Sequence, residues 1–158
     1  TDIEAFKRFL QNGIPESTKL QQSLNNGTFP HLDVKAWLMQ LFDEEVLNNE
    51  TTNAPLGCSW ATIDELLEFV GYDVPLVSKL EEDVYLVQIE ATYHCSLTGH
   101  VDIFSNDEAP GLIPYECHDG TLYYSLEEAV EVTVELEFNT KDNRMVSSEL
   151  QSIWLKNH

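Results

Sequence analysis

The chain has 158 residues, the size of one domain, and its 28 Asp and Glu against 8 Lys and Arg give a net charge of −20. Because 42% of the residues are hydrophobic, the composition supports a core and excludes a wholly disordered protein. The 61 residues 80–140 contain no Lys or Arg and 14 of the acids. A surface so poor in cations excludes direct binding to nucleic acid and to anionic membranes.

The first half of the chain repeats apolar residues at helical spacing. It predicts a first helix around residues 3–10 and a second that follows Pro15 and ends at residues 25–27. Asp33 is a suitable N-cap for a third helix, whose apolar stripe runs over residues 34–46.

A polar loop over residues 48–57 separates this helix from a fourth. The fourth is predicted to begin at Ser59 or Thr62 and to end at Gly71. Its apolar residues are spaced three and four apart, as on one helix face: Ile63, Leu66, Leu67 and Val70.

The second half changes to a period of two, which is typical of half-buried strands. We expect a strand over 84–95, a hairpin turn at 97–100 into a strand over 101–104, a long loop over 105–120, and a strand over 130–138. The tail from Met145 fits a helix and a bent strand equally well.

Helices followed by strands predict an α+β fold. We expect one domain, residues 1–158, in which a helical layer (1–72) packs on one face of an antiparallel sheet (83–155). Three tryptophans are expected to anchor the core, and any that is exposed would be a candidate interface hot spot: Trp37, Trp60 and Trp154.

Strand alternation places a set of acids on the face of the sheet that is in contact with water: Glu90, Glu131, Glu135 and Glu137. Along one strand such side chains recur at multiples of about 7 Å, a spacing similar to that of phosphates in nucleic acid. Solvated faces usually mix both signs of charge, so the lack of Lys favours a binding role. The alternative is a charged face that only prevents aggregation. A second acidic patch on the third helix comprises Asp43, Glu44 and Glu45.

The candidate metal ligands are His94, His100, Cys117 and His118. Structural zinc sites use ligand pairs that are separated by two to four residues. Here His94 and Cys95 are adjacent in a strand and point to opposite faces, and Cys117 and His118 are adjacent in a loop. We therefore expect no metal site and no cofactor.

A metal-dependent hydrolase is an alternative, because acids crowd around the long loop: Asp102, Asp107, Glu108, Glu116 and Asp119. Their spacing is not that of a calcium loop, and this region has no cation to hold a phosphate substrate. The chain also lacks the G-x-S-x-G motif and a glycine-rich phosphate loop. We expect no catalytic residue.

Three features predict a cytoplasmic protein. The first residues have neither the basic region nor the apolar region of a secretory signal, and no apolar run approaches the roughly 20 residues that cross a bilayer. The three cysteines are an odd number without a close pair, which argues against a disulfide framework.

The alternating segments VYLVQIEATYHC (84–95) and VEVTVELEF (130–138), with an acidic loop and Tyr123-Tyr124 between them, carry a resemblance. This layout resembles the β-rich region that follows the nuclease domain in some large bacterial PIN-domain proteins, and it covers under half of the chain. The acidic catalytic motif of PIN nucleases has no match here, so no catalytic residue carries over. The resemblance implies a non-catalytic accessory module in bacterial conflict or defence proteins.

Our leading hypothesis is a small acidic binding protein that associates stoichiometrically with a basic partner, such as a nuclease or another DNA-binding protein. It would act as an inhibitor, an immunity protein or a DNA mimic. Opposite charge accelerates such association above the neutral rate of ~10⁵–10⁶ M⁻¹s⁻¹. The alternatives are the hydrolase and an accessory subunit whose acidity serves solubility alone. The sequence leaves the oligomeric state open.

Overall fold

A computed structural model of the protein describes residues 16–29, 32–55, 58–102, 116–118, 120–142 and 144–156. Within these ranges, side chains are described everywhere except at 116–118. The first predicted helix, at residues 3–10, and most of the predicted loop over 105–120 lie outside the described residues. None of the helices in the described part of the chain is both long and apolar enough to span a membrane.

Helix α2 spans Glu16–Asn25, which confirms the helix predicted after Pro15. It ends where Gly27 adopts a φ of 67°, a left-handed conformation that glycine enters at little cost. Side chains of α2 then bind the backbone of Val74: Gln21 donates to its carbonyl at 2.7 Å, and Asn25 accepts from its N–H at 2.7 Å. These bonds fasten the helix to the first strand of the sheet.

Helix α3 spans Val34–Leu41 and continues into a wider turn, η1, over Phe42–Val46. Asp33 caps it as predicted, because its carboxylate accepts a hydrogen bond of 3.1 Å from the Ala36 N–H. The predicted apolar stripe is buried, except that Trp37 is only partly covered.

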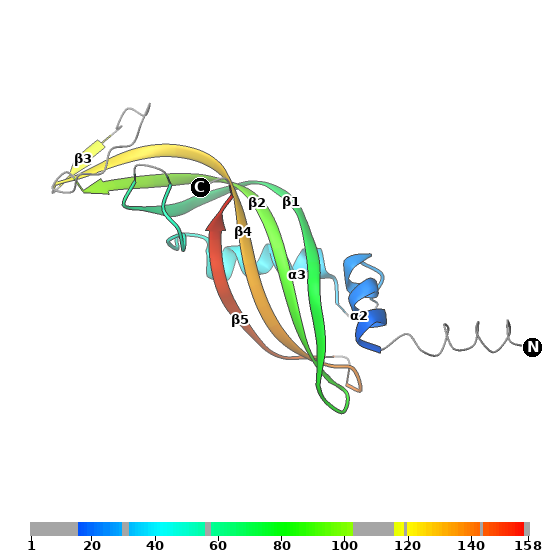
Figure 1. Ribbon diagram of the computed structural model, residues 1–158. Helices are drawn as coiled ribbons and strands as arrows, with labels where there is room; N and C mark the ends of the chain where they lie inside the picture. Colours follow the sequence, from blue (N-terminus) through cyan, green and yellow to red (C-terminus); the bar gives the residue numbers. More distant parts are fainter. Residues whose placement is uncertain are drawn as a thin grey trace, which may run out of the picture.

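The remaining elements form one antiparallel sheet, which Figure 1 shows to be long and strongly curved. Its strands are β1 (Trp60–Glu81), β2 (Val84–Asp102), β3 (Glu116–His118), β4 (Thr121–Asn139) and β5 (Arg144–Leu155). The order is β1-β2-β4-β3. Strand β3 pairs with residues 121–123 of β4, and β5 pairs with residues 130–139 of the same strand. The predicted α+β fold and the strands over 84–95 and 130–138 are confirmed, and the tail from Met145 is a strand.

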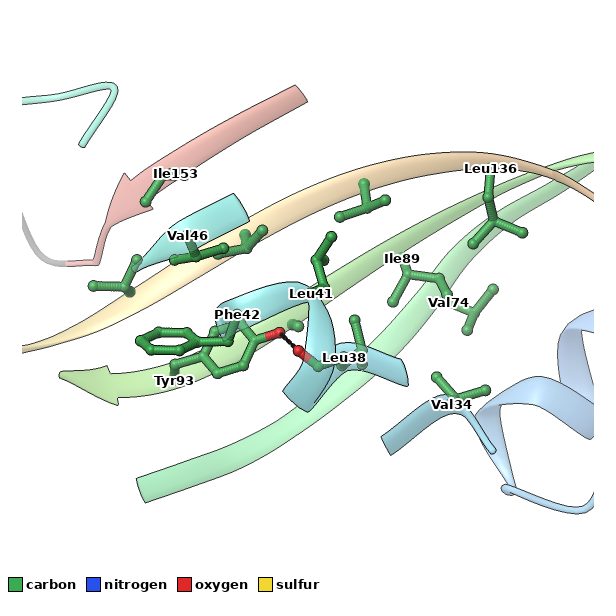
Figure 2. Packing of buried hydrophobic residues seen from close by; sticks show 14 of the residues in the cluster. Val34, Leu38, Leu41, Phe42, Val46, Val74, Ile89, Tyr93, Leu136 and Ile153 are labelled. Atoms are coloured by element: carbon green, nitrogen blue, oxygen red, sulfur yellow. Dashed lines mark hydrogen bonds between the residues drawn. The ribbon is translucent and has the colours of Figure 1, made fainter. Parts of the chain in front are cut away.

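The core lies between the helices and one face of the sheet, which we call the inner face. Alternate residues of β2 and β4 point to it, and Figure 2 shows Ile89 and Leu136 pointing toward the same interior as Leu38 and Leu41 of α3. Burying one such aliphatic side chain stabilises the fold by roughly 1.5–3 kcal/mol. The opposite side of the sheet, the outer face, has no helix over it among the described elements.

The predicted fourth helix is wrong, because residues 60–81 form strand β1. Its pairing with β2 is interrupted by a series of β-bulges, at each of which β1 has one extra residue. Three-residue steps along β1 therefore match two-residue steps along β2. Residues three apart then reach the inner face and imitate the spacing of a helix: Ile63, Leu66, Phe69 and Tyr72. The sheet begins at residue 60 instead of 83, and the predicted helical layer over 1–72 is shortened accordingly.

The predicted hairpin at residues 97–100 is also wrong, because β2 runs without a turn from Val84 to Asp102. Gly99 serves packing instead. A Cβ atom at Gly99 would lie 2.9 Å from Sγ of Cys58 and 3.0 Å from Cδ1 of Leu126. Only glycine allows these side chains to approach the strand so closely.

Residues 48–53 belong to the predicted polar loop, and they bridge two edges of the sheet. Asn48 and Asn49 exchange backbone hydrogen bonds of 2.8 and 3.0 Å with Ile63 of β1. The Asn53 side chain accepts from the N–H of Leu155 of β5 at 2.6 Å and donates to its carbonyl at 3.1 Å. The loop thus satisfies strand edges that would otherwise offer unpaired backbone groups.

Candidate functional site

The outer face of the sheet is acidic. The pleat sends every second residue of β2 and β4 to this face, and the register brings acids of β1 and β5 alongside. The predicted set of Glu90, Glu131, Glu135 and Glu137 lies here as expected. The structure adds further acids that were not predicted on this face: Asp64, Glu65, Glu68, Asp73, Glu127 and Glu149.

Two pairs of acids on the outer face are direct cross-strand neighbours. Asp73 of β1 is the Cα partner of Glu90 of β2, and Glu135 of β4 is the Cα partner of Glu149 of β5. Like charges directly opposite one another destabilise a sheet. The repulsion between these carboxylates therefore lowers the stability of the folded protein, and opposite or neutral residues at the same positions would not cause it.

Glu90 experiences this repulsion most clearly. Burial raises the pKa of its carboxyl group above the ordinary value, and the carboxylates of Glu131 and Asp73 raise it further. The ammonium group of Lys156 opposes the shift. An additional cation placed beside Glu90 would favour its ionised form.

Lys156 supplies a cation to the outer face from the chain itself. Its Nζ lies 3.5 Å from Oε2 of Glu131, and both side chains are partly exposed. Glu135 is instead approached by the amide of Gln151, which donates to it at 3.4 Å. An exposed ion pair such as Lys156–Glu131 contributes at most about 1 kcal/mol, so it neutralises the face only weakly.

A hollow of about 330 Å³ lies where β2, β4 and β5 meet. It is lined by three glutamates, two serines and two leucines, namely Leu86, Glu135, Leu136, Glu137, Ser147, Ser148 and Glu149. The acidic face is therefore not flat at this end and has room for a side chain from another molecule.

The second predicted patch lies elsewhere. Asp43, Glu44 and Glu45 are exposed on η1, whose buried residues Phe42 and Val46 face the inner side of the sheet. The helical layer and the sheet thus separate this patch from the outer face. One flat partner surface cannot contact both.

The candidate metal ligands are not brought together where their side chains are described. His94 and His100 lie six residues apart on β2, which is about 20 Å along a strand. Cys95 points the other way and is buried, which raises the pKa of its thiol to about 12. Across the described residues, no three His, Cys, Asp or Glu side chains are placed to hold a metal ion.

His100 belongs to an aromatic cluster at the far end of the sheet. Its ring stacks on Trp60 at a centroid distance of 4.8 Å and meets Tyr123 edge-on at 5.0 Å. Nε2 lies 3.2 Å from the Thr62 hydroxyl, while buried Nδ1 has no hydrogen-bond partner among the described residues. Burial lowers the pKa of the imidazole, against the opposing effects of Asp64 and Glu50, so the cluster favours a neutral ring.

Trp154 was expected in the core with the other tryptophans, yet it is 47% exposed on the outer face. Trp37 is partly buried against the core, and Trp60 is stacked on His100. Alternation with the buried residues Ile153 and Leu155 would have placed Trp154 outside, but only if the tail had been recognised as a strand.

No protein-family model matches this chain, and neither a curated protein nor a solved structure matches it. The resemblance to the accessory region of PIN-domain proteins stays a prediction.

Proposed function

We propose that the protein acts by stoichiometric binding, with its acidic outer face placed against a basic, nucleic-acid-binding protein. It would serve as an inhibitor, an immunity protein or a DNA mimic. The proposal is carried by two pairs of acids that are cross-strand neighbours, Asp73–Glu90 and Glu135–Glu149. Their repulsion costs the free protein stability, and a cationic partner would relieve it.

The composition of the face supports the same proposal. Residues 80–140, which provide β2 and β4, contain no Lys or Arg, so no cation of these two strands offsets their carboxylates. A net charge of −20 also attracts a basic partner from a distance and repels nucleic acid. Salt screens such attraction, since the Debye length is about 8 Å at physiological ionic strength.

The test compares two charge-reversed proteins. Variant E131K/E135K/E137K changes the charge of the outer face, and variant D43K/E44K/E45K makes the same change in net charge on η1. Tagged wild type and both variants are incubated with nuclease-treated lysate of the source organism at low and high salt. Captured proteins are identified, and the affinity for each is measured.

We expect a basic protein to bind the wild type and the η1 variant, and to bind the outer-face variant at least about tenfold more weakly. High salt should release it. If both variants lose the partner equally, overall charge matters and the outer face does not. If the outer-face variant binds as the wild type does, the acidity serves solubility, as in an accessory subunit.

A further inference from the structure

Trp154 is a large aromatic residue left exposed on the outer face. Ile153 and Leu155 on either side of it are buried, and Trp154 itself is 47% exposed. Its cross-strand partner is Glu131, and Trp154 belongs to neither of the hydrophobic clusters found among the described residues. Exposed tryptophans of this kind are enriched among the residues that dominate binding energy in protein interfaces.

An acidic residue is paired with Trp154 across the strands. Glu131 of β4 is the Cα partner of Trp154, which brings the Cβ atoms of such a pair to about 5 Å. Lys156, two residues beyond Trp154, places its Nζ 3.5 Å from this same carboxylate. The chain thus shows that a cation fits next to the Glu131 carboxylate.

We infer that Trp154 and Glu131 form a subsite for an arginine side chain of the basic partner. The guanidinium group lies on the face of the indole and donates N–H groups to the Glu131 carboxylate, and the neighbouring Glu90 adds negative charge. This inference rests on the proposed function and identifies the chemistry that the outer face recognises. Lys156 is 42% exposed, so its weak ion pair yields to the incoming arginine.

Arginine fits this subsite better than lysine does. Its planar guanidinium stacks on aromatic rings, matches a carboxylate with two parallel N–H groups and is less strongly hydrated. The ammonium group of lysine is compact and strongly hydrated, and it gains little from the ring. Two other occupants are disfavoured by charge, since both a second copy of this chain and a nucleic acid would bring further negative charge to an acidic face.

The test uses the full chain, uniformly labelled with ¹⁵N, and two probes: a hexa-arginine and a hexa-lysine peptide at low salt. The indole N–H resonance of Trp154 is assigned by its loss in Trp154→Phe. We expect hexa-arginine to shift this resonance and to bind about three- to tenfold more tightly than hexa-lysine. Trp154→Ala should abolish that preference, and Trp154→Tyr should restore part of it.

Leu76→Ala is the matched control. Leu76 is 44% exposed and pairs with Gln88 on the same face, so the variant removes a comparable apolar surface away from Glu131. It should keep the preference for arginine. If Leu76→Ala abolishes the preference for arginine as Trp154→Ala does, the assignment of the arginine subsite to Trp154 is overturned.

The remaining outcomes separate the inference from the proposed function. Equal binding of both peptides with an unmoved Trp154 resonance overturns the arginine subsite, but leaves charge-based binding by the outer face intact. Absence of binding by either peptide overturns the subsite, and the charge-reversed proteins then decide the proposed function independently. A Trp154 resonance that shifts with protein concentration alone, without peptide, would assign the face to a second copy and also overturn the subsite.

Discussion

The hydroxyl group of Tyr93 donates a hydrogen bond of 2.8 Å to the backbone carbonyl of Leu38, and so joins β2 to helix α3 (Figure 2). The bond forms where α3 widens into η1. There the N–H of Phe42 is shared between the carbonyls of Leu38 and Met39, so the carbonyl of Leu38 has capacity for a second donor. Both residues are fully buried, which makes this polar contact part of the core.

Tyr93→Phe should therefore lower the free energy of unfolding by about 1 kcal/mol, the typical net contribution of one such bond. The ring contacts of Tyr93 with Phe42 and Phe69 are retained in this variant. Tyr72→Phe is the comparison, because the Tyr72 hydroxyl donates to the carbonyl of Leu24 at 2.7 Å in a less buried place. Urea denaturation of both variants measures the two losses, and an unchanged Tyr93→Phe protein would contradict the role of the bond.

The stability of alanine variants in β1 distinguishes the bulged strand from a helix. Ile63 is buried, whereas Leu67 and Val70 are 43% and 58% exposed, although the three would share one face of a helix. Ile63→Ala should lower the free energy of unfolding by about 2–5 kcal/mol. Leu67→Ala and Val70→Ala should each change it by less than about 0.5 kcal/mol. Large losses in all three variants, measured by denaturation, would support the helix instead.

Substitution by alanine should affect the stability of the protein differently at two glycines of the sheet. At Gly99 a Cβ atom would lie 2.9 Å from Sγ of Cys58, so Gly99→Ala should destabilise the protein by about 1–3 kcal/mol. At Gly71 a Cβ atom would have no neighbour within 4 Å, so Gly71→Ala should be neutral or slightly stabilising. Thermal unfolding of the pair measures this difference. Equal melting temperatures would show that Cys58 does not pack against Gly99.

The raised pKa of Glu90 predicts how stability depends on pH. Folding favours the protonated carboxyl, so the free energy of unfolding should fall as pH rises from the ordinary value of 4.5 through the raised value. Glu90→Gln cannot ionise and should lack this loss. The variant should therefore be the more stable protein at pH 7, and its advantage should disappear well below pH 4.5.

Urea denaturation of wild type and Glu90→Gln over a pH series measures the effect. The difference between the two proteins is the quantity of interest, because other acids titrate in both. A difference that does not change with pH would mean that Asp73 and Glu131 do not act on Glu90 in the folded protein.

The acidic face could be predicted in part because alternation is a local property. In β4, buried Val130, Val132 and Val134 alternate with residues that must point outward, whatever the neighbouring strands are. The same rule places Glu90 on β2. Which acids of other strands stand opposite them depends on register, and the pairing of Asp73 with Glu90 follows from bulges that no local pattern reveals.

The sequence by itself determined the fold class, the helices after Pro15 and Asp33, and the strands over 84–95 and 130–138. In each of these segments a single period accounts for the apolar residues, so local geometry decides which side is buried. It also determined that β2 and β4 present acids on the outer face, because the charge and the alternation of each strand can be read from that strand alone.

Only the tertiary structure decided the conformation of residues 60–81. Apolar residues three apart, such as Ile63, Leu66 and Phe69, suit one face of a helix and equally one face of a strand with repeated bulges. The choice depends on pairing with Leu97, Cys95 and Tyr93 of β2, which lie 24 to 34 residues further along the chain. The exposure of Trp154 was decided in the same way, because pairing with β4 made the tail a strand and turned the indole to the outer face.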